Sequence, residues 1–302
     1  SARLVDTVVI QQTGGTKKSI DAGVVWIQAA LRQIAGVPRV AINVSDLTIG
    51  TVCGGSDATS GISANPAVGR AFDLLVRHGA ATIFEETGEM IGLGDVMCSR
   101  AVTPELGHEL KMSVDKAAHY YRQMGHASFA PGNAEGGLTT IEEKSIGAYC
   151  KSGDSVISGL IKPGDIPRKG GLYLLDVVPD GEPRFGFPNI NDNAEIAELI
   201  ACGSHMILFT TGRGSVVGSA ISPVIKVCAN PETYDRMRDD MDVNAGKILR
   251  LEASVDEVGE EIYNRVLDVA SGIPSCSESL GHQEFVLTYK SFEPIGPYCL
   301  PV

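Results

Sequence analysis

The alternation of short apolar runs with longer helical segments is the feature that most limits how this 302-residue chain can fold. Runs of four to six apolar residues are typical of strands that are covered on both faces. Segments with helical spacing of apolar residues separate most of these runs. The pattern predicts an α/β fold with a mostly parallel sheet covered by helices on both faces.

The boundaries of these elements follow from the same pattern. We expect strands at 6–11, 47–52, 81–84, 172–178, 205–210 and 224–228. We expect helices at 19–34, 65–78, 104–124, 140–150, 194–202, 231–241 and 255–270. The segments 130–137 and 179–193 are rich in Pro, Gly and Asn, which indicates loops. Because neither a repeat nor a domain linker is visible, residues 1–302 are expected to form a single α/β domain.

Composition excludes some classes of function. The net charge is −12 and the pI is about 5.0, so the chain is a poor candidate for binding the phosphates of a nucleic acid. No apolar run is long enough to cross a bilayer, and residues 1–8 lack the basic and apolar stretches of a signal peptide. We therefore expect a cytoplasmic protein with neither nucleic-acid nor membrane partners.

The chain has seven cysteines, and no pair has the CxxC spacing. An odd count in a chain without a secretory signal favours free thiols over a disulfide framework. Most of them are expected to be buried, but Cys53 and Cys276 lie beside polar sequence typical of loops. These two thiols are therefore candidate functional groups, in contrast to thiols that only pack in the core.

In open α/β sheets, ligands bind beyond the carboxyl ends of the strands. The segment 53–61 follows an expected strand and combines a thiol, hydroxyls, the Asp57 carboxylate and glycines. This composition is typical of a loop that binds a ligand and, about equally, of a glycine-rich turn that caps the following helix. The Arg213 side chain, flanked by glycines after another strand, is suited to holding a carboxylate.

Carboxylates also follow the expected strand at 81–84. Glu85, Glu86 and Glu89 fit either a metal ligand or base, or the acidic first turn of a helix. The HExxH, GxSxG, P-loop and dinucleotide-binding motifs are absent. The sequence therefore gives little support for a zinc hydrolase, a serine hydrolase or a nucleotide-dependent enzyme.

Five motifs, taken together, resemble those of the altronate/galactarate dehydratase family. They are 53–66, Glu86 with Glu89–Met90, 131–145, 211–214, and Cys276 with Glu278 followed by Lys290–Ser291. The resemblance extends from about Leu47 to Ser291. Several motifs in the right order are far more specific than any one of them alone.

The resemblance implies a Rossmann-like variant of the α/β fold, a divalent metal that is usually Fe(II), and dehydration of a sugar acid such as altronate or galactarate. In that reaction a base removes the proton beside a carboxylate, and a hydroxyl leaves the next carbon. A metal and an arginine stabilise the charge that develops.

The family motifs also imply roles for residues of this sequence. We expect Arg213 to bind the substrate carboxylate and Lys144, Glu142 or Glu143 to transfer protons. The residues expected to contact substrate are Ser56, Asp57, Asn133, Thr211 and Gly212. The residues expected to bind the metal are Cys53, Glu86, Cys276 and Glu278, and Asp57 is a further candidate to bind it or support its ligands.

The sequence departs from the family pattern in three places. An upstream segment with further Cys and His motifs is missing, so the domain is expected to be a truncated form. Asn244 stands where sugar-acid dehydratases tend to have a second Asp. The segment 280–285, LGHQEF, is similar to that of the sulfolactate sulfo-lyase large subunit, which eliminates sulfite.

We therefore expect the large-subunit type of altronate dehydratase, which pairs with a small β-clip (SAF-type) subunit. The alternatives are a sulfolactate sulfo-lyase large subunit and a non-catalytic Rossmann-like partner subunit. The substrate is expected to be a small anionic hydroxy acid, and the chain is expected to form a homo-oligomer.

Overall fold

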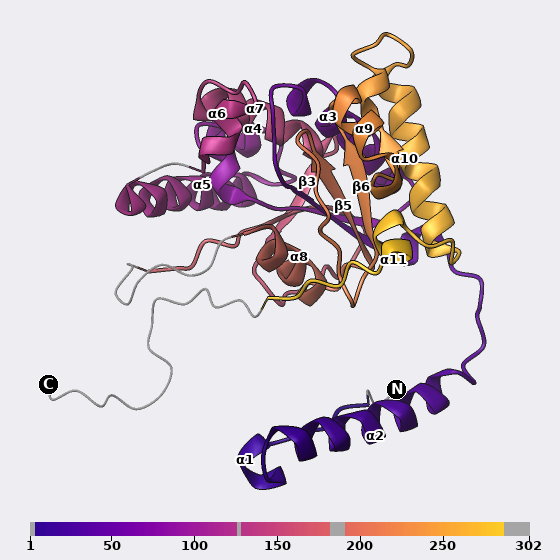
Figure 1. The fold of residues 1–302 in the computed structure, drawn as a ribbon. Coiled ribbons are helices and arrows are strands. Elements are labelled where there is room, and N and C mark those ends of the chain that lie inside the picture. The colour runs from indigo at the N-terminus through magenta and orange to yellow at the C-terminus, as the bar shows by residue number, and fades with distance from the viewer. Residues whose placement is uncertain (1–3, 126–127, 182–190, 287–302) are drawn as a thin grey trace, which may run out of the picture. The chain divides into compact units, whose positions relative to one another are not determined.

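The computed structural model describes residues 4–125, 128–181 and 191–286 (Figure 1). The chain divides into two compact units, residues 1–42 and residues 43–302. The single domain expected over 1–302 is therefore replaced by a main unit that begins at Asn43 and a separate unit before it.

The first unit consists of two helices, α1 (Ile10–Thr13) and α2 (Thr16–Ile34). Gly14 and Gly15, with φ of 96° and 101°, make the turn between them. Helix α2 confirms the helix expected here. The strand predicted at 6–11 is wrong, because residues 6–9 have no regular structure and α1 starts at Ile10. The apolar side chains of this run are exposed, so no core selects an extended conformation.

The main unit is built on a seven-stranded sheet in which every pairing is parallel, in the order β3-β4-β2-β1-β5-β6-β7. The strands are β1 (Thr48–Cys53), β2 (Ala81–Phe84), β3 (Ile157–Ile161), β4 (Gly171–Leu175), β5 (Met206–Thr211), β6 (Val224–Cys228) and β7 (Val243–Asn244). This confirms the predicted parallel sheet. The sequence did not predict the two edge strands, β3 and β7.

Helices cover both faces of the sheet (Figure 1). They are α3 (Ala64–Arg77), α4 (Gly94–Ser99), α5 (Pro104–Met124), α6 (Pro131–Glu135), α7 (Ile141–Tyr149), α8 (Asp192–Ala201), α9 (Pro231–Arg236), α10 (Val255–Ala270) and α11 (Cys276–Leu280). The larger core packs α3, α5 and α10 against one face, and a second core packs α8 against the other. Within the described residues, no helix has the length and apolar character needed to span a membrane.

The topology places a crevice at the centre of the sheet. After β1 the chain adds β2, β3 and β4 on one side, and then crosses over to add β5, β6 and β7 on the other. Cys53, the last residue of β1, pairs with Thr210 of β5 across this switch point. Open α/β sheets bind ligands in the crevice at the carboxyl ends of the strands on either side of such a point.

Candidate active site

A thiol and two carboxylates meet at the carboxyl end of β1. The Cys53 sulfur lies 3.4 Å from Oε1 of Glu86 and 3.5 Å from both carboxylate oxygens of Glu89. All three side chains are buried. One potential ligand atom from each lies within 4.8 Å of the others, so the three groups are close enough to share one metal ion. We call these three residues the Cys53 cluster.

The backbone around the cluster fixes its geometry. Glu86 follows β2 in the left-handed conformation, with a φ of 72°. A non-glycine residue in this region costs about 1–3 kcal/mol, and such strain is concentrated at functional sites. The Cys53 amide donates a hydrogen bond of 3.0 Å to Oε2 of Glu86. The 3₁₀ turn at Thr87–Met90 then carries Glu89 back towards the same sulfur.

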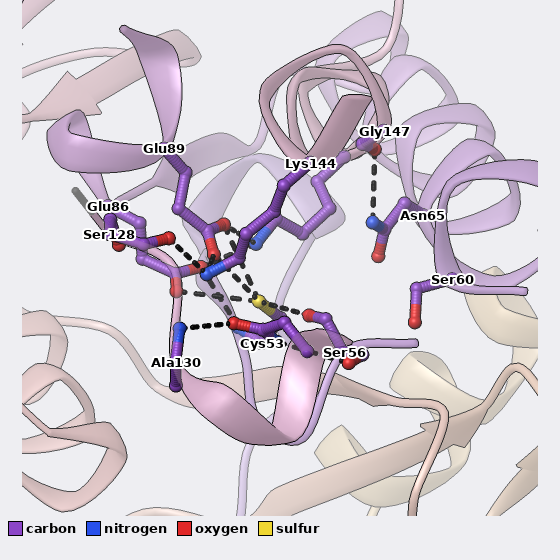
Figure 2. Close-up of polar contacts among 12 residues, drawn as sticks. Cys53, Ser56, Ser60, Asn65, Glu86, Glu89, Ser128, Ala130, Lys144 and Gly147 are labelled. Carbon is purple, nitrogen blue, oxygen red and sulfur yellow. Dashed lines mark hydrogen bonds and ion pairs between the residues drawn. The ribbon is translucent and has the colours of Figure 1, made fainter. Parts of the chain in front are cut away.

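Two lysines balance the charge of the carboxylates, and Figure 2 labels one of them, Lys144. Nζ of Lys144, on α7, lies 2.7 Å from Oε1 of Glu89. Lys151, in the 3₁₀ turn that follows α7, lies 2.5 Å from Oε2 of Glu86 and 3.3 Å from Oε2 of Glu89. The side chain of Lys151 is only 1% exposed. A buried charge with such partners is retained because each group compensates the other.

Burial and pairing shift the pKa values of the cluster. Burial, with the help of Glu89, raises the pKa of Glu86 to about 7 in spite of the lysines. Burial also favours the neutral form of Glu89, but Lys144 and Lys151 outweigh it and hold that pKa at about 2. Burial and both carboxylates raise the pKa of the Cys53 thiol. Burial disfavours the charged lysines, but the acidic groups outweigh it and raise both lysine pKa values.

The cluster opens into a cavity of about 630 Å³. Besides Cys53, Glu86, Glu89 and Lys144, the lining includes Ser56, Tyr121, Asn133, Asp192 and Glu195. Figure 2 shows the Glu86, Glu89 and Lys144 side chains converging on the Cys53 sulfur. A thiol, several carboxylates and an ammonium group therefore face one space large enough for a small organic acid.

The donor set of the Cys53 cluster fits a divalent transition metal. A thiolate is a soft ligand that hard cations such as Mg²⁺ do not select, whereas Fe(II) and Zn(II) accept both sulfur and carboxylate. Binding requires the Cys53 thiol to lose its proton and the lysine pairs to adjust, so metal affinity must rise with pH. The described residues offer three potential protein ligands for such a metal, and the site borders a cavity that could admit a substrate.

Comparison with known proteins agrees with this geometry. The family model described as D-galactarate/altronate dehydratase, C-terminal, matches residues 44–292. The chain belongs to this family. The matched residues include the whole sheet and the Cys53 cluster, so the shared sequence is the sequence that builds the cavity.

Three relatives show the range of the dehydratase family. The chain is 35% identical to the (2R)-sulfolactate sulfo-lyase subunit beta of Chromohalobacter salexigens over 83% of this chain and 63% of that protein. It is 40% identical to the galactarate dehydratase (L-threo-forming) of Escherichia coli over 76% and 42%. It is 34% identical to the altronate dehydratase of Bacillus subtilis over 84% and 49%. The alignments thus span about half the length of these proteins.

The structure brings several of the expected residues to the cavity and gives others a supporting role. Cys53, Glu86, Ser56, Asn133 and Lys144 all line it. The Ser56 hydroxyl donates to the Cys53 sulfur at 3.1 Å, and the Asn133 amide donates to the Ser56 carbonyl at 3.1 Å. Ser56 and Asn133 therefore hold the loop that follows Cys53 in place. Their contact with substrate stays a prediction.

Three residues expected to bind substrate, Asp57, Thr211 and Gly212, are not among the described residues that line this cavity, and Asp57 lines the smaller cavity beside it. Their contact with substrate stays a prediction. Oδ1 of Asp57 accepts from the Thr59 amide at 2.9 Å, and its Oδ2 accepts from Asn230 at 3.2 Å. A Cβ at Gly212 would lie 2.1 Å from Oδ1 of Asp57, so only glycine allows this approach. The Thr211 hydroxyl accepts from the Gly214 amide at 3.0 Å. These contacts fix the loops that follow β1 and β5.

Arg213, Glu142 and Glu143 are not among the described residues that line the cavity. The Arg213 side chain is 45% exposed, lies against the Cα of Gly132 and pairs at 3.6 Å with Glu135. Glu142 is exposed. Glu143 accepts hydrogen bonds from the Thr139 hydroxyl and amide, which lower its pKa, and it lines a smaller neighbouring cavity.

The structure does not bring Cys276 and Glu278 to the Cys53 cluster. They lie on α11, whose Ser277 hydroxyl donates to the carbonyl of Val224 at 2.6 Å. Val224 begins β6, so α11 packs at the amino end of the strands, opposite the cavity. Glu278 caps this helix through the Ser275 amide. The expectation that both residues bind the same metal as Cys53 is therefore corrected. Lys290–Ser291 lie outside the described residues.

Sequence reasoning missed three groups at the site: Lys151, Tyr121 and Asp192. A lysine two residues before a glycine, as at Lys151 and Gly153, is ordinarily interpreted as a solvated turn. Tyr121 belongs to a helix whose sequence is mostly polar. Asp192 lies at the start of α8, after a long loop. No local pattern marks any of them, because only the fold brings them to the cavity.

A neighbouring ion pair supports the turn that carries the cluster. Asp176, just after β4, accepts from Lys116 at 2.6 Å, from Lys162 at 2.8 Å and from the Thr87 hydroxyl at 3.2 Å. Burial works against its charged form, but the two lysines outweigh it and lower the pKa of Asp176.

Replacing Asp176 by Asn is expected to lower the free energy of unfolding by about 1–3 kcal/mol at neutral pH, because buried charged hydrogen bonds are lost. The folded-state pKa lies below the unfolded value, so this contribution is present above about pH 4 and fades as the pH falls through the folded pKa. Urea unfolding of both proteins from about pH 7 to about pH 3 checks this. A stability difference that does not narrow on acidification would contradict it.

Proposed function

We propose that this chain is the catalytic region of a metal-dependent lyase that eliminates a β-leaving group from a small hydroxy acid, with a sugar acid such as altronate or galactarate as substrate. The observation that carries the proposal is the buried Cys53 cluster, paired with two lysines and open to a cavity at the switch point of the sheet. The names of the relatives, two dehydratases and a sulfo-lyase, support the same reaction class.

The residues of the chain divide the work of such an elimination. Cys53, Glu86 and Glu89 would hold the divalent metal, which we propose to be Fe(II). A metal held by these residues would supply Lewis acidity, which would make the C–H bond beside the substrate carboxylate more acidic. Lys151 is too deeply buried to reach a ligand, so it keeps the two carboxylates in position.

Lys144 is the cation of the pair that faces the cavity. Its raised pKa keeps it protonated at neutral pH. We assign it the role of acid, which donates a proton to the departing hydroxyl because hydroxide is a poor leaving group. Of the acid–base groups expected from the sequence, Lys144 is the one that lines the cavity, so Glu142 and Glu143 are not assigned.

The sulfo-lyase relative defines the second candidate function. It is named as a subunit beta, and it aligns with 83% of this chain. Sulfite leaves as a stable anion and needs less help from an acid than hydroxide does. A small SAF-type subunit remains a proposed partner, and homo-oligomer formation remains a prediction.

The test combines metal analysis with turnover. The purified chain is loaded anaerobically with Fe(II), dialysed and assayed with altronate, galactarate and sulfolactate, with release of the 2-oxo acid or of sulfite as readout. We expect about one metal per chain and turnover of at least one of the three acids. Stoichiometric metal without any turnover would favour a non-catalytic partner subunit, and absence of bound metal would refute the proposed centre.

The Arg213→Ala variant tests whether Arg213, which does not line the described cavity, binds the substrate carboxylate. An exposed ion pair is worth about 0–1 kcal/mol, so Arg213→Ala is expected to reduce kcat/KM by less than about tenfold. Steady-state kinetics with the substrate that the wild type turns over measures this. A loss of about a hundredfold or more would instead mean that Arg213 moves to hold the substrate carboxylate, as its sequence motif suggests.

A further inference from the structure

Elimination requires a base for the α-proton, and most titratable groups around the cavity are unsuited to that role. Glu86 and Glu89 are paired with lysines and belong to the proposed metal centre. Lys144 forms an ion pair of 2.7 Å with Glu89 and is already assigned the role of acid. Burial raises the pKa of Tyr121, which keeps its hydroxyl neutral. The carboxylates of Asp192 and Glu195 remain.

We propose that Asp192 is the base that removes the α-proton of the substrate. This inference rests on the proposed function and names a catalytic residue for it. Asp192 lines the same cavity as Lys144 and the Cys53 cluster. Among the residues that the structure describes, the hydrogen bond that the Asp192 carboxylate accepts comes from its own backbone amide, and no other side chain pairs with it. Its side chain is part of the wall of the space that a ligand would occupy.

The position of Asp192 is fixed by close packing at the switch point. A Cβ added to Gly54 would come within 2.3 Å of Oδ2 of Asp192. The carboxylate thus lies directly against the backbone that follows Cys53, where glycine alone leaves room. Asn191 caps the helix by accepting from the Ala194 amide at 3.0 Å, which anchors the first turn of α8. A base must be held in this way to meet a C–H bond at a defined angle.

The electrostatic surroundings suit a base. Burial raises the pKa of Asp192, which makes its carboxylate a stronger proton acceptor. The other charged groups that act on it are Glu89, Lys144 and Lys151, and none of them is paired with it directly. Glu195 lies about one turn further along α8 and is more deeply buried, at 6% exposure. Asp192 is therefore the better placed of the two carboxylates.

The proposed step balances as follows. Asp192 takes the proton from the α-carbon, and the electron pair of the C–H bond forms the Cα–Cβ double bond. The Cβ–O bond breaks with its pair, and the departing oxygen takes a proton from Lys144 to leave as water. The enol product tautomerises to the 2-oxo acid. Asp192 then loses its proton to solvent, and Lys144 regains one.

The experiment compares Asp192→Asn with the matched variant Glu195→Gln, which also removes one carboxylate from the same wall. Each Fe(II)-loaded protein is incubated in D₂O with the acid that the wild type turns over, and NMR follows both product formation and deuterium at the α-carbon. We expect Asp192→Asn to lose elimination by about 10²–10⁴-fold, the usual contribution of a general base, and to incorporate no deuterium. Glu195→Gln is expected to lose less than about tenfold.

Two further readouts separate a base from a structural residue. Metal content and KM of Asp192→Asn should stay near wild type. Asp192→Glu should recover part of kcat and keep the decline of kcat/KM at acidic pH, which the Asn variant should lose.

Each other outcome has a clear meaning. Deuterium incorporation without elimination in Asp192→Asn would show that this residue is the acid, which overturns our assignment. Near wild-type elimination in that variant would remove Asp192 from the mechanism but leave the proposed function standing. A metal-loaded wild type that processes none of the three acids would overturn both.

Discussion

Replacing Lys151 by Met is expected to destabilise the protein by about 3–5 kcal/mol, because the change leaves two buried carboxylates with one cation between them. Lys151 is 1% exposed and contacts both Glu86 and Glu89, whereas Lys144 contacts Glu89. Urea unfolding of the metal-free protein measures the loss. Addition of a divalent metal should restore part of it, since a cation bound at the Cys53 cluster replaces the missing charge.

Lys162→Met is the matched control for this change. Its side chain is 39% exposed, and its partner Asp176 keeps a second lysine, Lys116. The same substitution there is expected to cost less than about 1 kcal/mol. If Lys151→Met unfolds at the same urea concentration as Lys162→Met, Lys151 does not stabilise the buried Glu86 and Glu89 carboxylates. That result would contradict the proposed charge balance of the site.

The sequence predicted helices and strands correctly where the spacing of apolar residues corresponds to a face that is buried in the core. The helix expected at 104–124 matches α5 to the residue, and the strands at β1, β2, β5 and β6 lie within one residue of their expected ends. Strand β3 was missed because Ser158 and Gly159 interrupt its apolar run. The apolar run before α1 was misread because periodicity cannot tell whether a core exists to bury it.

The site could be predicted in part, for a similar reason. Cys53 and Glu86 follow strands whose carboxyl ends meet, so the sheet rule selects them from sequence alone. Cys276 was expected beside them from a family motif, yet the motif says nothing about which end of β6 its helix packs against. Lys151 and Asp192 reach the cavity through contacts between elements distant in sequence, and these no local pattern can reveal.

Cys53→Ser is expected to abolish tight Fe(II) binding and, with it, turnover. Cys53 is the soft ligand of its cluster, and serine offers a hydroxyl of much higher pKa in its place. Loss of a group that only supports a metal ligand costs about 10–100-fold in affinity, so loss of the ligand itself should cost more. Metal retained after dialysis against a chelator measures this. In the Co(II)-loaded protein, the thiolate-to-cobalt charge-transfer band should be present in wild type and absent in the variant.

Cys228→Ser is the matched control, because Cys228 is another fully buried thiol with a raised pKa at the carboxyl end of a strand, in this case β6. Its sulfur donates to the Asn230 carbonyl at 3.4 Å, an interaction that a hydroxyl can replace. This variant should retain the metal and the charge-transfer band. If Cys53→Ser retained both as well, the sulfur would not be a ligand, and two carboxylates already neutralised by lysines would make a poor metal site. The lyase assignment would then need its Lewis acid at another place in the fold.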